Sequence, residues 1–214
     1  ALQIGDNKFM KIPNAAAMET ALDEEAKILL RLADANRVEI PKLIGSEAMK
    51  VKICHKLRRE VSTLHCLEME GIVGKPSTVL CEFSPEIRKP KVAPIVQQVY
   101  EALCFAHKRK IFHLDVRPGN IIVSLDFKSA MLSDWGCALN GKIQQTRFRG
   151  CPPYAHNDVL LKGKWYPQKK YDFASLAYTL GHLSEGTLCW RGFSTKNRDL
   201  VEERRTFVMK NKTQ

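Results

Sequence analysis

The chain has 214 residues, a formal net charge of +11 and 44% hydrophobic residues, which is enough to bury one sizeable core. It contains no apolar run of about 18 residues and no charged-then-apolar leader, so we expect no membrane span and no secretion signal. The seven cysteines have no paired spacing, which argues against a zinc site or a disulfide framework and favours reduced thiols in the cytoplasm or nucleus.

The positive charge is divided among separate runs of the sequence. Lys and Arg are concentrated in residues 50–59, 89–91, 108–110, 147–149, 162–170 and 198–205. These runs carry no recognised nucleic-acid-binding motif. We therefore expect no specific nucleic-acid partner, although so basic a chain attracts anions nonspecifically.

Two elements are predicted near the N-terminus. Polar and apolar side chains alternate over residues 8–13, which predicts a short strand. Residues 20–33 place apolar side chains, Leu29 among them, on one helical stripe, and Glu25 lies on the same stripe. A carboxylate on a buried face is costly unless it is paired, so we expect Glu25 to meet a cation. A solvated Glu25 at the edge of the stripe is the alternative.

Further elements follow in the middle of the chain. Residues 64–69 predict a strand, and the basic run 50–59 indicates a solvated face or an insertion between strands. Residues 95–107 have apolar side chains at helical spacing, which predicts a helix. Another helix is expected to run through Leu176 and Leu180, and Asp172 could be merely its N-cap.

Two short motifs carry the chemistry. His113-Leu-Asp115-Val-Arg-Pro-Gly-Asn120 is followed, 14 residues after its Asn, by Asp134-Trp135-Gly136. The phosphates of ATP arrive with Mg²⁺, which needs a few hard oxygen ligands. Asn120 and Asp134 could supply them, leaving Asp115 to orient or deprotonate an attacking hydroxyl. The pair of motifs therefore indicates metal-assisted phosphoryl transfer.

These motifs resemble the catalytic loop and the metal-binding turn of the eukaryotic protein kinases, and Trp135 resembles the variant of that turn found in casein kinases. The resemblance implies a two-lobed α+β fold in a single domain over residues 1–214. A small, β-rich N-lobe would occupy residues 1–70 and a mainly helical C-lobe residues 71–214, with ATP and Mg²⁺ between them. We call residues 113–120 the catalytic loop and residues 134–136 the metal turn.

Other segments resemble the same family in the same order. Residues 95–107 stand where its long helix enters the catalytic loop, and residues 150–155 resemble the substrate-docking end of its activation segment. Asp158 falls where the Ala-Pro-Glu motif ends, with Asp in place of Glu. Residues 171–176 resemble the start of a buried central helix, where Asp172 would hold the catalytic loop. The resemblance makes His113 and Gly136 structural.

The resemblance also assigns nucleotide-binding residues. Lys11 stands where the family carries its phosphate-pairing Lys, with Glu25 as its partner. The connection between lobes, which contacts adenine, would be Glu70, Gly71 and Ile72. Residues 79–83 rival that position, but a connection there leaves too little chain before the next helix. Arg117 replaces the commoner Lys and keeps a cation for the γ-phosphate.

The chain also departs from the family. Ten residues precede Lys11, too few for two strands and a Gly-rich loop over the phosphates. The chain ends soon after Trp190, so we expect the last helices to be missing, and with them the Arg that usually pairs with the residue at 158. Leu114 replaces an Arg that gathers an activation-loop phosphate, so any activity should be constitutive although Thr146 offers an acceptor.

Three functions remain open. The first is a Ser/Thr protein kinase, whose substrates would be proteins or peptides. Acidic or phosphorylated substrates would explain the positive net charge as well as nucleic acid would. The second is a small-molecule phosphotransferase of the aminoglycoside-kinase type, a lineage without the docking segment 150–154. The third is an inactive kinase-like binding module. Retention of five residues argues against the third: Lys11, Glu25, Asp115, Asn120 and Asp134. The oligomeric state is left open.

Overall fold

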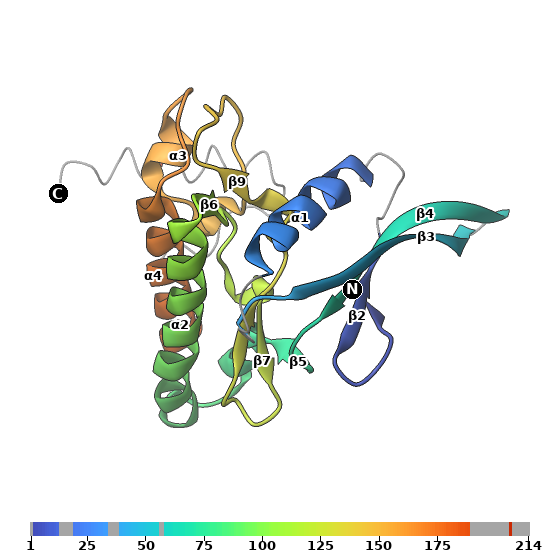
Figure 1. Cartoon of the computed structure of the whole chain (residues 1–214). Helices are drawn as coiled ribbons and strands as arrows, with labels where there is room; N and C mark the ends of the chain where they lie inside the picture. Colours follow the sequence, from blue (N-terminus) through green and yellow to red (C-terminus); the bar gives the residue numbers. More distant parts are fainter. Residues whose placement is uncertain (1, 13–18, 34–38, 56–57, 189–205, 207–214) are drawn as a thin grey trace.

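The computed structural model describes residues 2–12, 19–33, 39–55, 58–188 and 206. An antiparallel sheet and one helix form the N-terminal part, and a mainly helical body follows (Figure 1). The two-lobed α+β fold expected from the sequence is thus observed. No helix in the described ranges is long and apolar enough to cross a membrane.

The N-terminal sheet has the strand order β1-β2-β4-β3, with every neighbouring pair antiparallel. Its strands are β1 (Leu2–Gln3), β2 (Lys8–Lys11), β3 (Lys42–His55) and β4 (Arg58–Glu70). The predicted strand 64–69 is the end of β4, which is much longer because it pairs with β3 along its whole length. The basic run 50–59 lies mostly within these paired strands, in the hairpin that extends away from the body (Figure 1).

Helix α1 (Glu19–Leu32) covers the sheet on the side of the C-terminal body. Its apolar stripe is buried as the sequence predicts from Leu22 to Leu32, with Leu29 fully enclosed, whereas Ala33 at its end is exposed. In the sheet, Phe9 pairs with Met69 and Lys11 with Leu67. This register fixes Lys11 at the end of β2, beside the helix that carries Glu25.

Helices α2 (Pro85–Lys108) and α4 (Lys169–Glu185) pack against each other and form the centre of the C-terminal body (Figure 1). The prediction of a helix over 95–107 was too short. Helix α2 begins ten residues earlier because Pro85 occupies its first turn, where a missing N–H costs nothing, and because Arg88 and Val92 are buried. The rival lobe connection, residues 79–83, overlaps a 3₁₀ helix, η2 (Ser77–Glu82).

Two small sheets hold the functional loops. Strands β5 (Gly74–Pro76), β7 (Ile121–Ser124) and β8 (Ala130–Leu132) form one sheet, and β6 (Ile111–Phe112) pairs with β9 (Leu139–Asn140) in the other. The catalytic loop connects β6 to β7, and the metal turn connects β8 to β9. Because β7 pairs with β8 and β6 with β9, both motifs emerge side by side.

The core is one apolar cluster that runs from α1 and β4 through β7 and β8 to α2 and α4. A second, smaller group lies around the catalytic loop. We call it the Leu114 cluster; it contains Phe112, Leu114, Val159, Trp165 and Tyr171, with Leu139 and Phe148 packed against it. Of the cysteines in the described ranges, five form no disulfide: Cys66, Cys81, Cys104, Cys137 and Cys151.

Candidate active site

Asp172 on α4 anchors the start of the catalytic loop. Its side chain is 0% exposed; Oδ1 accepts a hydrogen bond from the backbone N–H of Leu114 at 2.7 Å, and Oδ2 accepts one from that of His113 at 2.9 Å. Oδ2 also lies 2.8 Å from His107 Nε2. Because α4 begins at Lys169, Asp172 lies inside its first turn and is not the N-cap.

His113 joins the catalytic loop to the metal turn. Its Nε2 lies 3.0 Å from the carbonyl oxygen of Ser133, and its Nδ1 accepts a hydrogen bond from the backbone N–H of Asp115 at 3.2 Å. The ring meets the edge of Trp135 at a centroid distance of 4.7 Å. The residue is fully buried, so it positions other groups instead of reacting.

The two carboxylate oxygens of Asp115 have different surroundings. Oδ2 accepts hydrogen bonds from Asn120 Nδ2 at 2.8 Å and from Arg117 Nε at 3.2 Å. Oδ1 is buried and has no hydrogen-bond partner among the described residues. A Cβ at Gly150 would lie 3.5 Å from this oxygen, so the glycine leaves the approach to it open. Oδ1 is therefore an unused acceptor.

A cavity of about 390 Å³ lies at Asp115. It is lined by Asp115, Arg117, Cys137, Phe148, Gly150, Cys151 and Pro152. Burial, reinforced by the negative charge of Asp115, raises the pKa of Cys151 to about 11, so this thiol stays protonated. We call this space the acceptor cavity.

Lys11 bridges the two lobes. Its Nζ lies 2.6 Å from Glu25 Oε2 and 2.7 Å from Asp134 Oδ1. Burial lowers the pKa of Lys11, but the two carboxylates outweigh burial and hold that pKa above its usual value. Burial likewise raises the pKa of Asp134, but Lys11 outweighs it and keeps that pKa low. Lys11 and Asp134 are therefore both charged.

Glu25 is buried and paired, so the solvated alternative is wrong. It is 3% exposed, and burial raises its pKa more than Lys11 lowers it. We nevertheless regard the carboxyl as ionised, because Oε2 meets the charged Lys11 and Oε1 accepts the backbone N–H of Trp135 at 3.1 Å. A Cβ at Gly136 would lie 3.3 Å from Glu25 Oε2, so this glycine lets the carboxylate approach the metal turn.

The metal turn has an unusual backbone. Asp134 has φ 60°, in the left-handed region that residues with a Cβ seldom occupy. The turn is held from both sides, since the Trp135 N–H groups of backbone and indole donate to Glu25 and to the carbonyl oxygen of Leu132. This enclosure directs the Asp134 carboxylate toward Lys11.

A cleft of about 410 Å³ lies between the lobes. Its lining includes the expected nucleotide-binding residues together with those expected to hold the metal: Lys11, Glu25, Glu70, Gly71, Ile72, Asn120 and Asp134. Leu29 was expected to be structural, and it lies in the apolar core. A Cβ at Gly71 would lie 2.6 Å from Met131 Sδ, so only glycine leaves this wall of the cleft open without displacing Met131.

Two positioning contacts were not predicted. Ser77 Oγ donates to the carbonyl oxygen of Pro118 at 2.9 Å, and Thr179 Oγ1 donates to that of Val116 at 3.4 Å. Both hydroxyls are fully buried. The signal that could have found Thr179 is its place two helical turns after Asp172, on the buried face of the same helix.

Asp158 pairs with two lysines that lie nearby in the sequence. Its Oδ2 lies 2.6 Å from Lys170 Nζ and 3.1 Å from Lys162 Nζ. The hydrogen bond from Lys170 is the main reason that its pKa falls to about 2. The expectation about the last helices and their Arg concerns residues after 188, which lie almost entirely outside the described ranges. Asp158 joins α3 (Asn157–Leu161), which follows the docking segment, to the start of α4.

Leu114 fixes the activation segment by apolar contact. Its φ is 65°, and its side chain is buried in the Leu114 cluster against residues on both sides of that segment. Gly150 has φ 90°, and a Cβ there would clash with the carbonyl oxygen of Leu114. The catalytic loop and the docking segment therefore meet closely, backbone against backbone.

Comparison with known proteins agrees with this geometry. The sequence profile of the protein kinase domain matches residues 8–214. The chain belongs to the protein kinase family. It is 27% identical to serine/threonine-protein kinase 10-A of Xenopus laevis, over 84% of this chain and 19% of that protein. It is 30% identical to serine/threonine-protein kinase pakE of Dictyostelium discoideum, over 64% of this chain and 14% of that protein.

A third kinase relative is serine/threonine-protein kinase SULU of Caenorhabditis elegans, 27% identical over 77% of this chain and 16% of that protein. The chain thus spans less than a fifth of the length of these relatives.

Proposed function

We propose that this kinase chain transfers the γ-phosphoryl group of ATP, with Mg²⁺, to Ser or Thr hydroxyls of protein substrates. The observation that carries the proposal is the buried, unpartnered Asp115 Oδ1 in the acceptor cavity. A buried carboxylate oxygen without a donor is costly unless a donor arrives during function. A substrate hydroxyl is such a donor.

The residues present fit the nucleotide and the metal. Lys11 is charged and lies in the cleft, where it can meet a phosphate. Asn120 donates through Nδ2 to Asp115, which leaves its carbonyl oxygen available beside Asp134. Among the described residues no group of three or more His, Cys, Asp or Glu could hold a metal, which suits an ion that takes further ligands from phosphates and water. When bound, Mg²⁺ neutralises charge on the phosphate oxygens.

The chain's own residues then have distinct tasks. Asp115 Oδ1 orients the acceptor hydroxyl and takes its proton. Arg117, whose pKa is raised by Asp115 against the effect of burial, stays cationic and stabilises charge on the transferred group. Lys11, held by Glu25, positions the phosphates.

Acidic or phosphorylated peptides are the proposed substrates. Four exposed cations flank the docking segment: Arg147, Arg149, Lys162 and Lys164. They favour anionic residues near the acceptor. Of the alternatives, a small-molecule phosphotransferase is disfavoured because η5 (Pro152–Tyr154) and α3 build a docking segment ahead of α4. An inactive module is disfavoured by the connected set Lys11, Glu25 and Asp134.

The test combines calorimetry with phosphate transfer. ATP should bind in the presence of Mg²⁺ and more weakly in EDTA, and Asp134→Asn should abolish this difference. With γ-labelled ATP and a mixture of acidic proteins, label should appear on phosphoserine or phosphothreonine. Label on an aminoglycoside instead would favour the second function, and absence of Mg²⁺-dependent ATP binding would favour the inactive module.

A further inference from the structure

Basic residues from three distant parts of the sequence meet at one corner of the molecule. Arg31 Nη2 donates to the carbonyl oxygen of Arg109 at 3.1 Å, which joins the end of α1 to the end of α2. The N–H of Gly141 donates to the carbonyl oxygen of Lys110 at 3.0 Å, which brings the start of the activation segment to the same corner. We call the resulting surface the basic corner; its cations are Arg31, Lys108, Arg109, Lys110 and Lys142.

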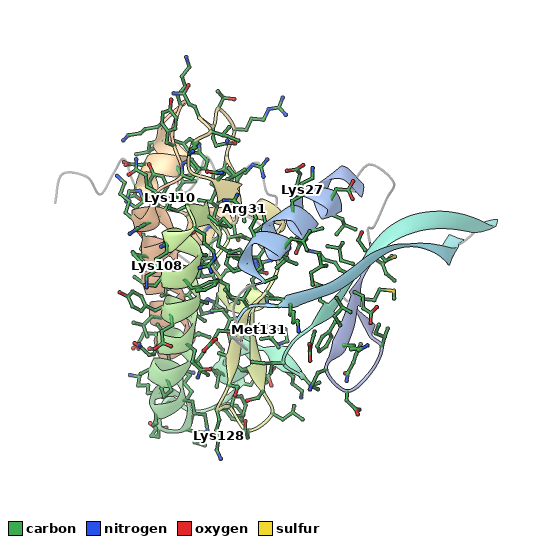
Figure 2. All side chains as sticks on the ribbon, in the orientation of Figure 1. Lys27, Arg31, Lys108, Lys110, Lys128 and Met131 are labelled. Atoms are coloured by element: carbon green, nitrogen blue, oxygen red, sulfur yellow. The ribbon has the colours of Figure 1, made fainter. Side chains whose placement is uncertain are left out.

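The charges of the basic corner are available to a partner. Arg31, Lys108, Lys110 and Lys142 are exposed, and none of the five cations forms an ion pair with a described carboxylate. Figure 2 labels Arg31 and Lys110 at the junction of α1 with β6 and β9, and Lys128 at the opposite end of α2. Like charges held together raise the local potential, so this corner attracts anions more strongly than isolated lysines do.

Apolar side chains accompany the charges. Leu30, beside Arg31, is 61% exposed, and Ile143, beside Lys142, is 57% exposed. Exposed aliphatic residues next to cations suit a peptide that mixes carboxylates with aliphatic side chains. Nucleic acid would be better served by exposed aromatic rings for base stacking, which these positions do not supply.

The basic corner is continuous with the site of transfer. Lys142 belongs to the activation segment, and Phe148 of the same segment lines the acceptor cavity. Five residues lie between them, so a chain path of at most about 20 Å connects the two places. A substrate can occupy both at once through a short linker, and binding at the corner then raises the local concentration of its hydroxyl at Asp115.

The geometry points to a docking site at the basic corner for an acidic, aliphatic-containing segment of a protein substrate, separate from the residue that is phosphorylated. This inference rests on the proposed function, because only a kinase has a substrate to dock. The binding itself requires neither nucleotide nor transfer, so the two can fail independently.

The experiment measures binding of a fluorescent Glu- and Leu-rich peptide to the full chain by anisotropy, without nucleotide. Lys108→Glu with Lys142→Glu should weaken binding by roughly fivefold or more. The matched control is Lys89→Glu with Lys128→Glu, two exposed lysines at the other end of α2, and it should change affinity less than about twofold. Thermal unfolding verifies that both double variants fold, and the neutral pair Lys108→Gln with Lys142→Gln should show an intermediate loss.

Three results would overturn the inference. One is no binding of the peptide to the unsubstituted chain, and a second is equal weakening in the two double variants. The third is tighter binding of an oligothymidylate that depends on the same lysines, which would assign the corner to nucleic acid. If the peptide binds as expected but no phosphate is transferred, the proposed function fails and the acidic-peptide site stands.

Discussion

At the scale of single residues, Asp115 divides its work between two oxygens. Asn120 and Arg117 hold Oδ2, which fixes the direction of Oδ1 toward the acceptor cavity. An amide at this position would keep an oxygen for hydrogen bonding but could not take a proton at neutral pH. Under the proposed function, a substitution of Asp115 should therefore impair phosphate transfer without impairing nucleotide binding.

We expect Asp115→Asn to lower phosphate transfer by about 10²–10⁴-fold with little change in ATP affinity, because the residue faces the acceptor hydroxyl and not the nucleotide. Lys11→Met should mainly weaken phosphate positioning and raise the dissociation constant of Mg²⁺-ATP. Single-turnover rates and calorimetry measure the two effects. Equal loss of ATP affinity in both variants would contradict these roles.

The motif residues were readable from the sequence because phosphoryl transfer requires particular groups at short, fixed spacing. Asn120 reaches Asp115 across five residues, and one turn positions Asp134 and Gly136 together. The support from Ser77 and Thr179 was not readable, since their partners are carbonyl oxygens 41 and 63 residues away. Every residue carries a carbonyl oxygen, so the sequence offers a hydroxyl many possible acceptors. Only the packing of the fold determines which one it contacts.

At the scale of elements, the activation segment is held by apolar packing. Leu114 packs in a cluster with Phe112 and Val159, which lie on either side of the segment in the sequence. Thr146, by contrast, is exposed. We therefore expect the order of the segment to depend on Leu114 and not on a phosphate at Thr146.

We predict that Thr146→Ala protein, or protein treated with phosphatase, retains most of its transfer rate. Leu114→Ala should lose much more, because removing a buried leucine costs about 2–5 kcal/mol and loosens the cluster. Steady-state rates of the three preparations on one substrate decide the matter. A many-fold loss on dephosphorylation, restored by rephosphorylating Thr146, would refute the prediction.

Asp158 gives the docking region a pH dependence. Its pKa of about 2 in the folded chain lies below its ordinary value of 3.8, so the carboxylate stabilises the fold above about pH 4 and loses this effect as the pH falls toward 2. Asp158→Asn should lower the urea midpoint at pH 6, and the difference from the unsubstituted chain should shrink by pH 2.5. Asp6→Asn, at an exposed turn, is the control and should behave like the unsubstituted chain at both pH values.

Helix α2 illustrates why some elements were predicted only in part. Pro90 and Pro94 interrupt its helical pattern, so the sequence favours a start at residue 95. Burial of Arg88 and Val92 outweighs this local preference, and Arg88 donates to the carbonyl oxygens of Phe83 and Ser184. Such tertiary contacts override propensity and are invisible in a sequence window.

At the scale of the whole molecule, the cleft depends on a close approach between the lobes. Gly71 follows β4 of the N-lobe, and Met131, labelled between the lobes in Figure 2, belongs to β8 of the C-lobe. A methyl group at residue 71 would force the end of the Met131 side chain aside, and that side chain lines the cleft in which we propose that the nucleotide binds.

Gly71→Ala should therefore weaken ATP binding at a cost of about 1–3 kcal/mol while leaving the fold intact. Met131→Ala in the same chain should restore most of the affinity by removing the obstructing side chain. Calorimetry measures both variants, and thermal unfolding checks the fold. If the double variant binds no better than Gly71→Ala alone, the contact with Met131 is not the cause.

The Leu114 cluster also decides what kind of control this molecule can receive. A phosphate that orders a loop is added by a kinase and removed by a phosphatase, and its interaction with cations weakens as salt screens the charges. Apolar packing such as that of the Leu114 cluster carries no modification that an enzyme could remove. Its contribution to stability does not depend on charge screening and decreases on cooling. If the proposed activity holds, we therefore expect phosphorylation to follow the amount of this chain and its encounters with a substrate, and not chemical modification of the activation segment.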